Sequence, residues 1–393
     1  MTPSARQSRS PRWDVIVVGA GPAGATAARV AAERGQRVLL LERASLPRYK
    51  TCGGGLVGAA VAALPPSFRV PSLDHIDQIT VSNRFRNPRT VTHNEPTAHM
   101  VYRAAFDAAL TEMAVEAGAV LRESTVVTAL EPAAHSVTVT VDKGRRLNAR
   151  CVVGADGSSS RVARHVAVRC EQVDLALEVE IPVTGPVARN WRGRTLLDWG
   201  ALPGSYAWVF PKGDQLTIGV LAHRGHGDAT RAYLREFLAE NAPRGVEPVR
   251  RSGHLTRCRA QDSPLSRGRV LVAGDAAGLL DPMFREGISF ALRSGSLAGA
   301  AAADVADAES AADVRDATIV YARRIHETLG GEMHAGRLLL AAFERHPGLF
   351  HTGLTRIPPI SKKLFDYAAG RTTIPELVGG PPGRMALHLL SRM

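Results

Sequence analysis

The chain has 393 residues, a length that fits two packed domains or one large domain with an added lobe. Hydrophobic residues make up 45% and charged residues 22%, which favours a globular protein over a disordered or fibrous one. The 49 Lys and Arg against 37 Asp and Glu leave a formal charge of +12, but the arginines are scattered and lack interleaved aromatic residues, so we expect no nucleic-acid partner.

The basic charge leaves two interpretations open, a dispersed solvated surface or contact with an anionic membrane surface. No run reaches the roughly 18 uninterrupted apolar residues of a membrane span, so such contact would be peripheral, at the inner face of the membrane. The four cysteines show neither Cys-x-x-Cys pairing nor metal-ligand spacing with histidine, and residues 1–12 hold no apolar signal segment. We therefore expect a cytoplasmic protein with reduced thiols and no metal site.

Residues 13–18 predict a strand that runs directly into a glycine-rich turn and a helix beginning near Pro22. Gly19 permits the tight turn, Gly21 leaves room for a pyrophosphate to approach the backbone, and Gly24 lets the helix pack closely on the strand. The positive N-terminal end of such a helix attracts phosphate. The segment therefore predicts a dinucleotide cradle.

Glu42 closes the next predicted strand, residues 37–41. An acid at this position accepts hydrogen bonds from the adenosine ribose and disfavours a 2′-phosphate, so the cradle favours FAD or NAD over NADP. Only one such glycine turn that joins a predicted strand to a predicted helix and is followed by an acid occurs in the sequence. A tightly held FAD would occupy it and leave no second site for a resident nicotinamide.

The glycine-rich segment 47–55 interrupts the pattern of strands and helices, which indicates that a ligand lies close to its backbone. A helix is predicted from Tyr102 to Ala114, ending at Gly118, because its apolar residues fall on one face. Alternation predicts a strand at residues 136–141, and a short buried strand follows at residues 151–154.

Spaced β-like runs, separated by Gly and Pro turns, continue from about residue 170 to 262. The runs are residues 175–181, 195–199, 207–210 and 216–221. They predict an antiparallel sheet built into the nucleotide-binding domain.

Residues 269–278 return to a strand and turn, and residues 288–302 predict an alanine-rich helix. The chain from about residue 310 is predicted to be mostly helical. Its expected breaks lie near Pro347, Pro358 and Gly379.

Three segments far apart in the sequence together resemble the FAD domain of the flavoprotein hydroxylase superfamily. They are residues 19–24 with Glu42, residues 154–157, and residues 274–278 with Pro282 and residues 286–288. The resemblance implies that Asp275 hydrogen-bonds the ribityl chain of FAD and that Asp156 and Gly157 close over the pyrophosphate. Arg103 matches the arginine of the helix that borders the flavin. Taken singly, each aspartate is also compatible with an ordinary turn.

This resemblance implies FAD as the cofactor and an α/β fold: a Rossmann-like FAD-binding domain, an inserted antiparallel β-sheet substrate domain and a C-terminal helical region. The expected boundaries are 12–79, 100–169 and 263–308 for the FAD-binding domain, 80–99 and 170–262 for the substrate domain, and 309–393 for the helical region. The implied cofactor-binding residues are Gly19, Gly21, Pro22, Ala23, Gly24, Glu42, Arg43, Cys52, Gly53, Arg103, Asp156, Gly157, Gly274, Asp275, Gly287 and Ile288.

A closer resemblance, from residue 13 to about 300, is to the geranylgeranyl reductase family. It rests on Pro47-Arg48-x-Lys50-x-Cys52-Gly53-Gly54 and Tyr206-x-Trp208-x-Phe210-Pro211. It implies hydride transfer from reduced FAD to carbon-carbon double bonds of a prenyl lipid, either a geranylgeranyl chain or a polyprenyl quinone. An external electron donor would dock transiently, whether reduced nicotinamide, ferredoxin or flavin. The implied pocket residues are Gly54, Tyr206, Trp208, Phe210, Pro211 and Pro282.

Several observations keep other interpretations open. The three aromatic residues alternate along one strand, as they would in a plain sheet core. The family's Gly-x-Gly after this motif is here Gly219-Val220-Leu221, and Leu221 would reshape the pocket. Arg285 stands where many members have a small residue.

Two other functions stay open. The main alternative is an FAD-dependent monooxygenase or epoxidase acting on a hydrophobic substrate, and a flavin-free binding protein is the third hypothesis.

Cys52 is the candidate catalytic residue, because the resemblance places it beside the flavin ring. Reduction of an unactivated double bond needs a proton donor near the alkene. A thiol with a pKa of about 8.5 is a poor acid for that purpose, so Cys52 is equally compatible with proton relay, with shaping the site, or with a small residue tolerated beside the ring. No histidine shows triad or metal-ligand spacing, so we expect all histidines to be structural or on the surface.

Overall fold

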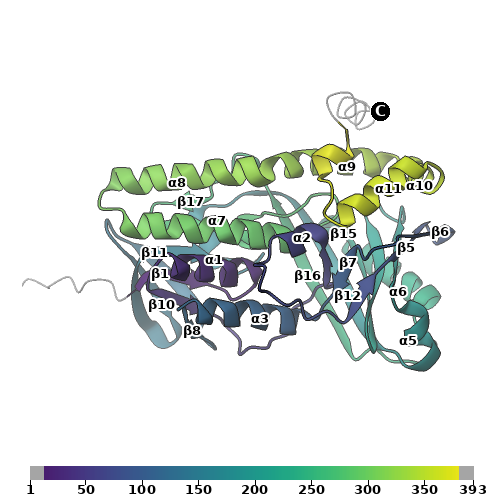
Figure 1. Ribbon diagram of the computed structural model, residues 1–393, viewed down its shortest axis with the longest axis horizontal. Helices are drawn as coiled ribbons and strands as arrows, with labels where there is room; N and C mark the ends of the chain where they lie inside the picture. The colour runs from purple at the N-terminus through teal and green to yellow at the C-terminus, as the bar shows by residue number, and fades with distance from the viewer. Residues whose placement is uncertain (1–12, 380–393) are drawn as a thin grey trace, which may run out of the picture.

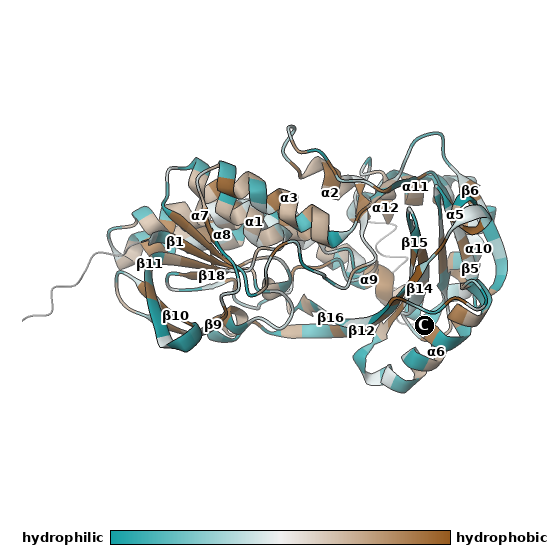
Figure 2. Cartoon of the chain, turned by 90° about the horizontal axis from the view of Figure 1, so that it is seen from below, coloured by the Kyte–Doolittle hydropathy of each residue, from teal (hydrophilic) through white to brown (hydrophobic). Residues whose placement is uncertain are grey.

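Two large sheets lie at opposite ends of the computed structural model, which describes residues 13–379 (Figure 1, Figure 2). The first sheet has the strand order β17-β18-β11-β1-β2-β8, and its strands from β18 to β8 are parallel. Its strands are β1 (Trp13–Val18), β2 (Val38–Leu41), β8 (Val120–Arg122), β9 (Val127–Pro132), β10 (Val137–Val141), β11 (Arg145–Gly154), β17 (Ser266–Arg267) and β18 (Val270–Val272). The parallel sheet confirms the predicted Rossmann-like α/β class.

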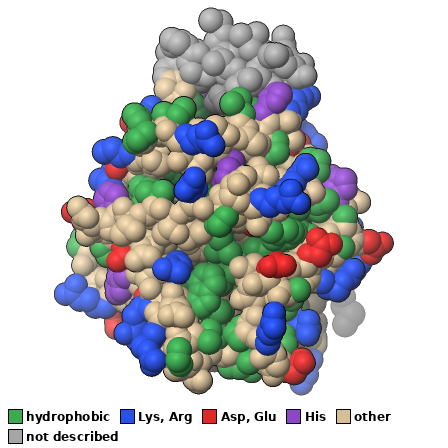
Figure 3. Space-filling model, turned by 90° about the vertical axis from the view of Figure 1, so that its right-hand side faces the viewer, with side chains coloured by type: hydrophobic (Ala, Val, Ile, Leu, Met, Phe, Trp, Pro, Cys, Tyr) green, Lys and Arg blue, Asp and Glu red, His purple; other side chains and the backbone are tan. Residues whose placement is uncertain are grey.

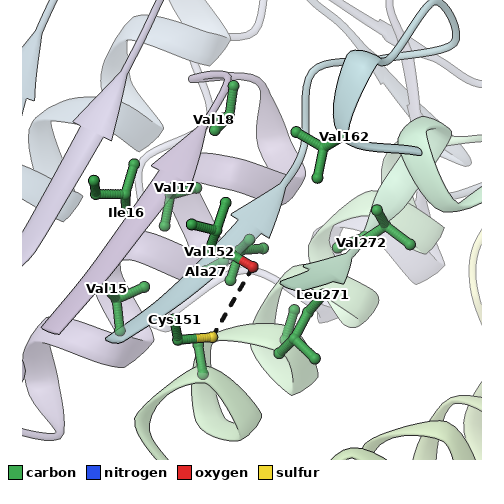
Figure 4. Packing of buried hydrophobic residues seen from close by; sticks show 14 of the residues in the cluster. Val15, Ile16, Val17, Val18, Ala27, Cys151, Val152, Val162, Leu271 and Val272 are labelled. Atoms are coloured by element: carbon green, nitrogen blue, oxygen red, sulfur yellow. Dashed lines mark hydrogen bonds between the residues drawn. The ribbon is translucent and has the colours of Figure 1, made fainter. Parts of the chain in front are cut away.

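The central strands of the first sheet are buried on both faces because their sequences are nearly continuous apolar runs. Val15, Ile16 and Val17 of β1 are fully buried, and they belong to one core with Val152 of β11 and Leu271 of β18 (Figure 4). The glycine turn after β1 therefore follows the end of a rigid, closely packed strand.

Helices α1 and α7 lie side by side over the first sheet (Figure 1). The helices at this end are α1 (Pro22–Glu33), α3 (Arg103–Glu116), α4 (Arg161–Val166) and α7 (Ile288–Asp307). A Cβ on Gly299 would lie 2.5 Å from the carbonyl oxygen of Ala27, and one on Gly295 would lie 3.0 Å from the carbonyl carbon of Ala23. Only small residues allow this approach, and we call these four residues the α1–α7 seam.

The second sheet has the strand order β16-β12-β15-β14-β13-β5-β6 and is antiparallel except between β13 and β5. Its strands are β5 (Gln78–Asn83), β6 (Arg86–Thr92), β12 (Cys170–Pro182), β13 (Arg194–Trp199), β14 (Tyr206–Lys212), β15 (Gln215–His223) and β16 (Arg250–Arg259). A three-stranded sheet of β3 (Gly55–Val57), β4 (Asp74–Ile76) and β7 (Ala98–Met100) has the order β3-β7-β4, and α2 (Gly58–Ala62) follows β3. Its strand β7 contacts β14 of the second sheet, and β3 contacts α7.

Two helices fall in the region where the sequence predicts only strands, α5 (Gly185–Trp191) and α6 (Gly227–Asn241). Tyr233 and Phe237 of α6 are one helical turn apart and pack against Val209 and Ile218 of the second sheet. This contact covers one face of the sheet, and the other face is left to line a cavity.

The C-terminal helices run from the first sheet to the second (Figure 1). They are α8 (Ala311–Ile325), a π-helical turn (His326–Gly330), α9 (Gly331–Arg345), α10 (Pro347–Arg356), α11 (Pro358–Ala368) and α12 (Ile374–Leu377). Pro347 and Pro358, predicted as breaks, are the first residues of α10 and α11, because a proline there lacks only an N–H that the helix does not use. Within residues 13–379, no helix combines the length and apolar character that a membrane crossing requires.

Candidate cofactor and substrate site

The glycine turn after β1 has the geometry that the sequence predicts. Gly19 has φ +102°, and a Cβ there would lie 2.8 Å from the carbonyl carbon of Ala155. Gly24 packs directly on Gly19 instead of lining the cavity. Gly21 is the N-cap of α1, which has neither a side-chain cap nor an acidic residue in its first turn. The N–H groups at this helix end are therefore available to an anion.

Glu42 and Arg48 meet beside this turn. One carboxylate oxygen of Glu42 accepts from the backbone N–H of Ala20 at 2.9 Å, and the other lies 3.3 Å from Nε of Arg48. Arg48 also donates to Asp107 at 3.0 Å and lies beside Gly21 in the cavity lining. The sequence motif names Arg48 but assigns it no role, and the structure adds its positive charge to the phosphate end of the cradle.

Asp107 holds two arginines. Its fully buried carboxylate accepts a bidentate pair of hydrogen bonds from Arg103, at 2.8 and 2.9 Å, as well as the bond from Arg48. Arg103 lies in the cavity lining, where the sequence predicts it. Since the guanidinium is fixed by both bonds, its position is set before any ligand arrives.

The carboxylate of Asp156 has a local partner that the sequence does not reveal. It accepts from the hydroxyl of Ser160 and from the backbone N–H of Arg161 at 2.7 Å, so it caps the start of α4. Gly157 follows in the cavity lining with φ +79°. Asp156 therefore positions this turn through α4, and its contact with a pyrophosphate stays a prediction.

Asp275 lies in a cluster of charged groups. His254 Nε2 is 3.7 Å from the Asp275 carboxylate, 3.0 Å from Lys50 Nζ and 3.4 Å from the hydroxyl of Ser158. Burial works to raise the pKa of Asp275, but its contact with His254 and the charge of Lys50 outweigh burial and hold the pKa below its ordinary value. All four residues line the cavity, although the sequence suggests that the histidines are structural or on the surface.

The Cys52 segment is held by two buried ionisable residues that the sequence analysis does not identify. The backbone N–H of Cys52 donates to Glu178 at 2.9 Å, and Lys212 donates to the carbonyl of Cys52 at 3.2 Å. Burial raises the pKa of Glu178 and lowers the pKa of Lys212. Gly54 has φ +75°, and a Cβ there would meet Lys212 Cε at 2.9 Å. The backbone of this segment is thus fixed at the middle of the cavity.

Tyr206, Trp208 and Phe210 form an aromatic wall on the cavity side of β14. Their ring centroids are 5.9 and 6.2 Å apart in order along the strand. Trp208 Nε1 is buried without a hydrogen-bond partner among the described residues, beside Gly53. Gly219 of the neighbouring strand leaves room for the indole, since a Cβ there would lie 2.6 Å from Trp208 Cε2.

Besides Gly24, three predicted site residues lie outside the cavity lining. Pro211 is on the opposite face of β14 from the aromatic wall, because strand side chains alternate. Pro282 packs against Gly336 of α9, and Gly274 approaches Ala23 of α1. These three residues therefore pack around the cavity and do not form its surface.

The cavity has a volume of 1130 Å³ and extends from the glycine turn to the C-terminal helices. Its far end is lined by apolar residues of these helices, namely Leu339, Phe343, Phe350, Leu354, Leu364, Leu377 and Val378. Tyr367 of α11 stacks on Phe284 at 4.9 Å and donates to the buried Asp281 at 2.8 Å. Burial raises the pKa of Asp281 to about 7. The helical region thus completes the cavity.

The family described as FAD binding domain matches residues 12–313. The digeranylgeranylglycerophospholipid reductase of Methanocella arvoryzae is 32% identical over 73% of this chain and 76% of its own length. A geranylgeranyl bacteriochlorophyll reductase-like structure from Thermoplasma acidophilum shares the fold with a TM-score of 0.76, at 21% identity over 96% of this chain and 99% of that one. A flavin-dependent brominase has a TM-score of 0.73 at 20% identity over 96% of this chain and 97% of that one.

Proposed function

The chain belongs to the FAD-binding domain family and is an FAD-dependent oxidoreductase related to geranylgeranyl reductases; from this premise we propose that it reduces carbon-carbon double bonds of a prenyl lipid. In this proposal the discontinuous FAD-binding domain keeps the predicted boundaries and the second sheet supplies the substrate wall. The names of the relatives support the substrate class.

The described residues fit FAD. The uncapped N-terminus of α1 and the guanidinium of Arg48 would hold the pyrophosphate, and a Cβ on Gly19 would close the turn that makes room for it. Glu42 would accept from the ribose and Asp275 from the ribityl chain. The cavity continues beyond these residues, so the cofactor and a second ligand have separate places in it.

The observation that carries the prenyl substrate is the apolar far half of the cavity. The aromatic wall forms one side, and apolar side chains of α9, α10 and α11 form the other. Such a lining binds a long hydrocarbon chain by removing it from water and offers few polar groups to orient anything else. Leu221 also lines the cavity, opposite Tyr206 in register, and narrows it where the family motif has glycine.

FAD, when bound and reduced, supplies a hydride, and this chain's residues must supply the proton that completes the reduction. Cys52 is the predicted catalytic residue, and its thiol accepts the N–H of Gly54 at 3.4 Å. Glu178 holds a proton more tightly than an exposed glutamate because burial raises its pKa. Tyr49 donates to Glu178 at 3.3 Å and shares a hydrogen bond with Ser252 at 2.8 Å. These bonds offer a route by which a proton could reach Glu178 from the half-exposed side of the Cys52 segment.

The same proposal includes an external electron donor and a cytoplasmic location. The sequence has one predicted dinucleotide cradle, which FAD would occupy, so reduced nicotinamide, ferredoxin or free flavin would dock transiently. The reduced thiols expected from the cysteine pattern agree with a cytoplasmic protein.

Anaerobic stopped-flow absorbance tests the reductase. The FAD-loaded protein is reduced with dithionite, mixed with geranylgeranyl diphosphate or a polyprenyl quinone without oxygen, and followed at the flavin band. We expect reoxidation, with the reduced lipid identified by mass spectrometry. If the flavin stays reduced until oxygen is admitted, the reductase proposal fails and an oxygen-using monooxygenase or epoxidase is favoured. Purified protein that contains no flavin would instead indicate the binding-protein hypothesis.

A further inference from the structure

The cavity reaches the surface at two ends of different character. At the cradle end, the exposed lining residues include two arginines, Arg43 and Arg161, and one apolar residue, Val126. At the far end, exposed lining residues belong to α10 and α11, and Leu349 and Ile360 are apolar. A lipid chain bound at the aromatic wall would therefore leave the protein past an apolar rim.

This rim belongs to a larger exposed apolar surface. Leu349 is 56% exposed, Ile357 is 47% exposed and Ile360 is 40% exposed, and all three lie on α10, α11 or the junction between them. Single exposed apolar residues are ordinary, but three on one helix pair at a cavity mouth are characteristic of a binding surface. We call these three residues, with Lys362 and Lys363, the α10–α11 patch.

The charge around the apolar residues is positive. Arg356, Lys362 and Lys363 are exposed on the same two helices, and Lys363 also lines the cavity. The acid of α11, Asp366, already pairs with Lys362 at 2.6 Å and with Arg371 at 2.9 Å. Figure 3 shows this end of the molecule, where hydrophobic side chains gather among Lys and Arg side chains. Apolar residues ringed by cations match the interface of an anionic bilayer.

We propose that the α10–α11 patch docks on an anionic membrane surface, so that the cavity mouth opens directly toward the lipid tails. The inference rests on the proposed function for the identity of the lipid, but the docking itself is independent of turnover. A prenyl chain that left a bilayer through water would expose every methylene on the way. A mouth set into the interface avoids this exposure, and the polar end stays in water for the electron donor.

Sedimentation with sucrose-loaded vesicles tests the proposal on the FAD-loaded full chain. Vesicles of pure phosphatidylcholine are compared with vesicles containing phosphatidylglycerol. We expect binding to the anionic vesicles that weakens at high salt. Lys362→Glu with Lys363→Glu should weaken it by about 25-fold or more, since each lysine near such a surface contributes a factor of about 5 and the two factors multiply.

Matched variants separate the patch from general effects. Leu349→Ser with Ile360→Ser should also weaken binding, whereas Ile319→Ser, at a 59% exposed site on α8, and Lys143→Glu, in a turn of the first sheet, should not. Retained flavin absorbance and far-ultraviolet circular dichroism show that each variant is folded.

Three results would overturn the proposal: no binding to anionic vesicles, equal binding by patch and control variants, or a concentration-dependent dimer that the patch variants abolish. Binding that appears only when the chain ends at Gly379 would also overturn it, because residues 380–393 would then be what covers the patch. Vesicle binding without anaerobic flavin reoxidation rejects the proposed function and leaves the docking intact. The reverse result rejects the docking alone.

Discussion

Replacing Gly219 by alanine is expected to displace the central residue of the aromatic wall. Trp208 and Gly219 are directly paired between β14 and β15, and the new Cβ would lie 2.6 and 2.7 Å from Cε2 and Cη2 of the indole. Carbon atoms prefer a separation of about 3.5–4.0 Å, so the ring must move by about 1 Å. Tyr206 and Phe210 flank it along the strand, and the cavity is the direction left to it.

The cost of this overpacking is about 1–3 kcal/mol, which corresponds to a melting temperature a few degrees lower. Thermal unfolding of the FAD-loaded protein measures it, and near-ultraviolet circular dichroism reports the indole. Gly253→Ala is the matched control on β16 of the same sheet, because its new Cβ would meet the flexible end of the Leu177 side chain at 3.1 Å and the carbonyl oxygen of Ala176 at 3.4 Å, with no ring in the way. We expect this control to change stability much less.

A double-mutant cycle isolates the contact. In a Trp208→Leu background the clashing ring is gone, so adding Gly219→Ala should cost little, with a coupling energy of about 1–3 kcal/mol. An equal cost of Gly219→Ala in both backgrounds would refute the reasoning, as would a Gly219→Ala variant as stable as the Gly253→Ala control.

Three further predictions concern individual carboxyl and thiol groups. Asp275→Ala should weaken FAD binding about 10- to 100-fold by loss of a charge-assisted hydrogen bond, measured by equilibrium dialysis, and unchanged affinity would contradict its role. Cys52→Ala should retain FAD but lower the rate of anaerobic flavin reoxidation by prenyl substrate at least about tenfold, and an equal rate would remove the thiol from the mechanism. Burial raises the pKa of Asp281 from its ordinary value of 3.8 to about 7, so its stabilising contribution is present below pH 3.8 and is lost as pH rises through 7. Relative to Asp281→Asn, the native protein should lose about 2–3 kcal/mol of stability between pH 5 and pH 8 in denaturant titrations, and a difference that does not vary with pH would argue against a buried carboxyl.

The cofactor cradle could be predicted from the sequence because its signals are local. The strand before Gly19, the helix from Pro22 and the acid at Glu42 are each specified by neighbouring residues. FAD as cofactor and the α/β class are confirmed by the family match and by the parallel sheet. Such signals can be recognised without knowledge of distant contacts.

Residues of the second sheet were harder to predict because strand register brings them to the site. Glu178 meets Cys52 only because β12 pairs with β15 and β16, and His254 reaches Lys50 and Asp275 only from its place on β16. In the sequence each is a polar residue in an alternating strand, a pattern that fits a solvated face equally well.

Helix α6 and the cavity-lining position of the C-terminal helices were not predicted, for two different reasons. Tyr233 and Phe237 are spaced by four residues, a helical signal that the surrounding β-like runs obscured. Leu354 and Leu364 lie on helices that the sequence predicts, but their place in the cavity depends on how α10 and α11 fold back on the second sheet. Periodicity specifies a helix and does not specify its neighbour.

The α1–α7 seam sets the spacing between two parts of the predicted FAD site. Ala23, beside the turn predicted to hold the pyrophosphate, packs against Gly295 on α7, and also against Gly274, which precedes Asp275, the acid predicted to bind the ribityl chain. Ala23 of α1 therefore fixes the distance between the glycine turn and Gly274. A methyl group added at Gly295 would collide with the backbone of Ala23 and push α1 away from α7. The spacing between the glycine turn and Asp275 thus depends on the absence of side chains between two helices.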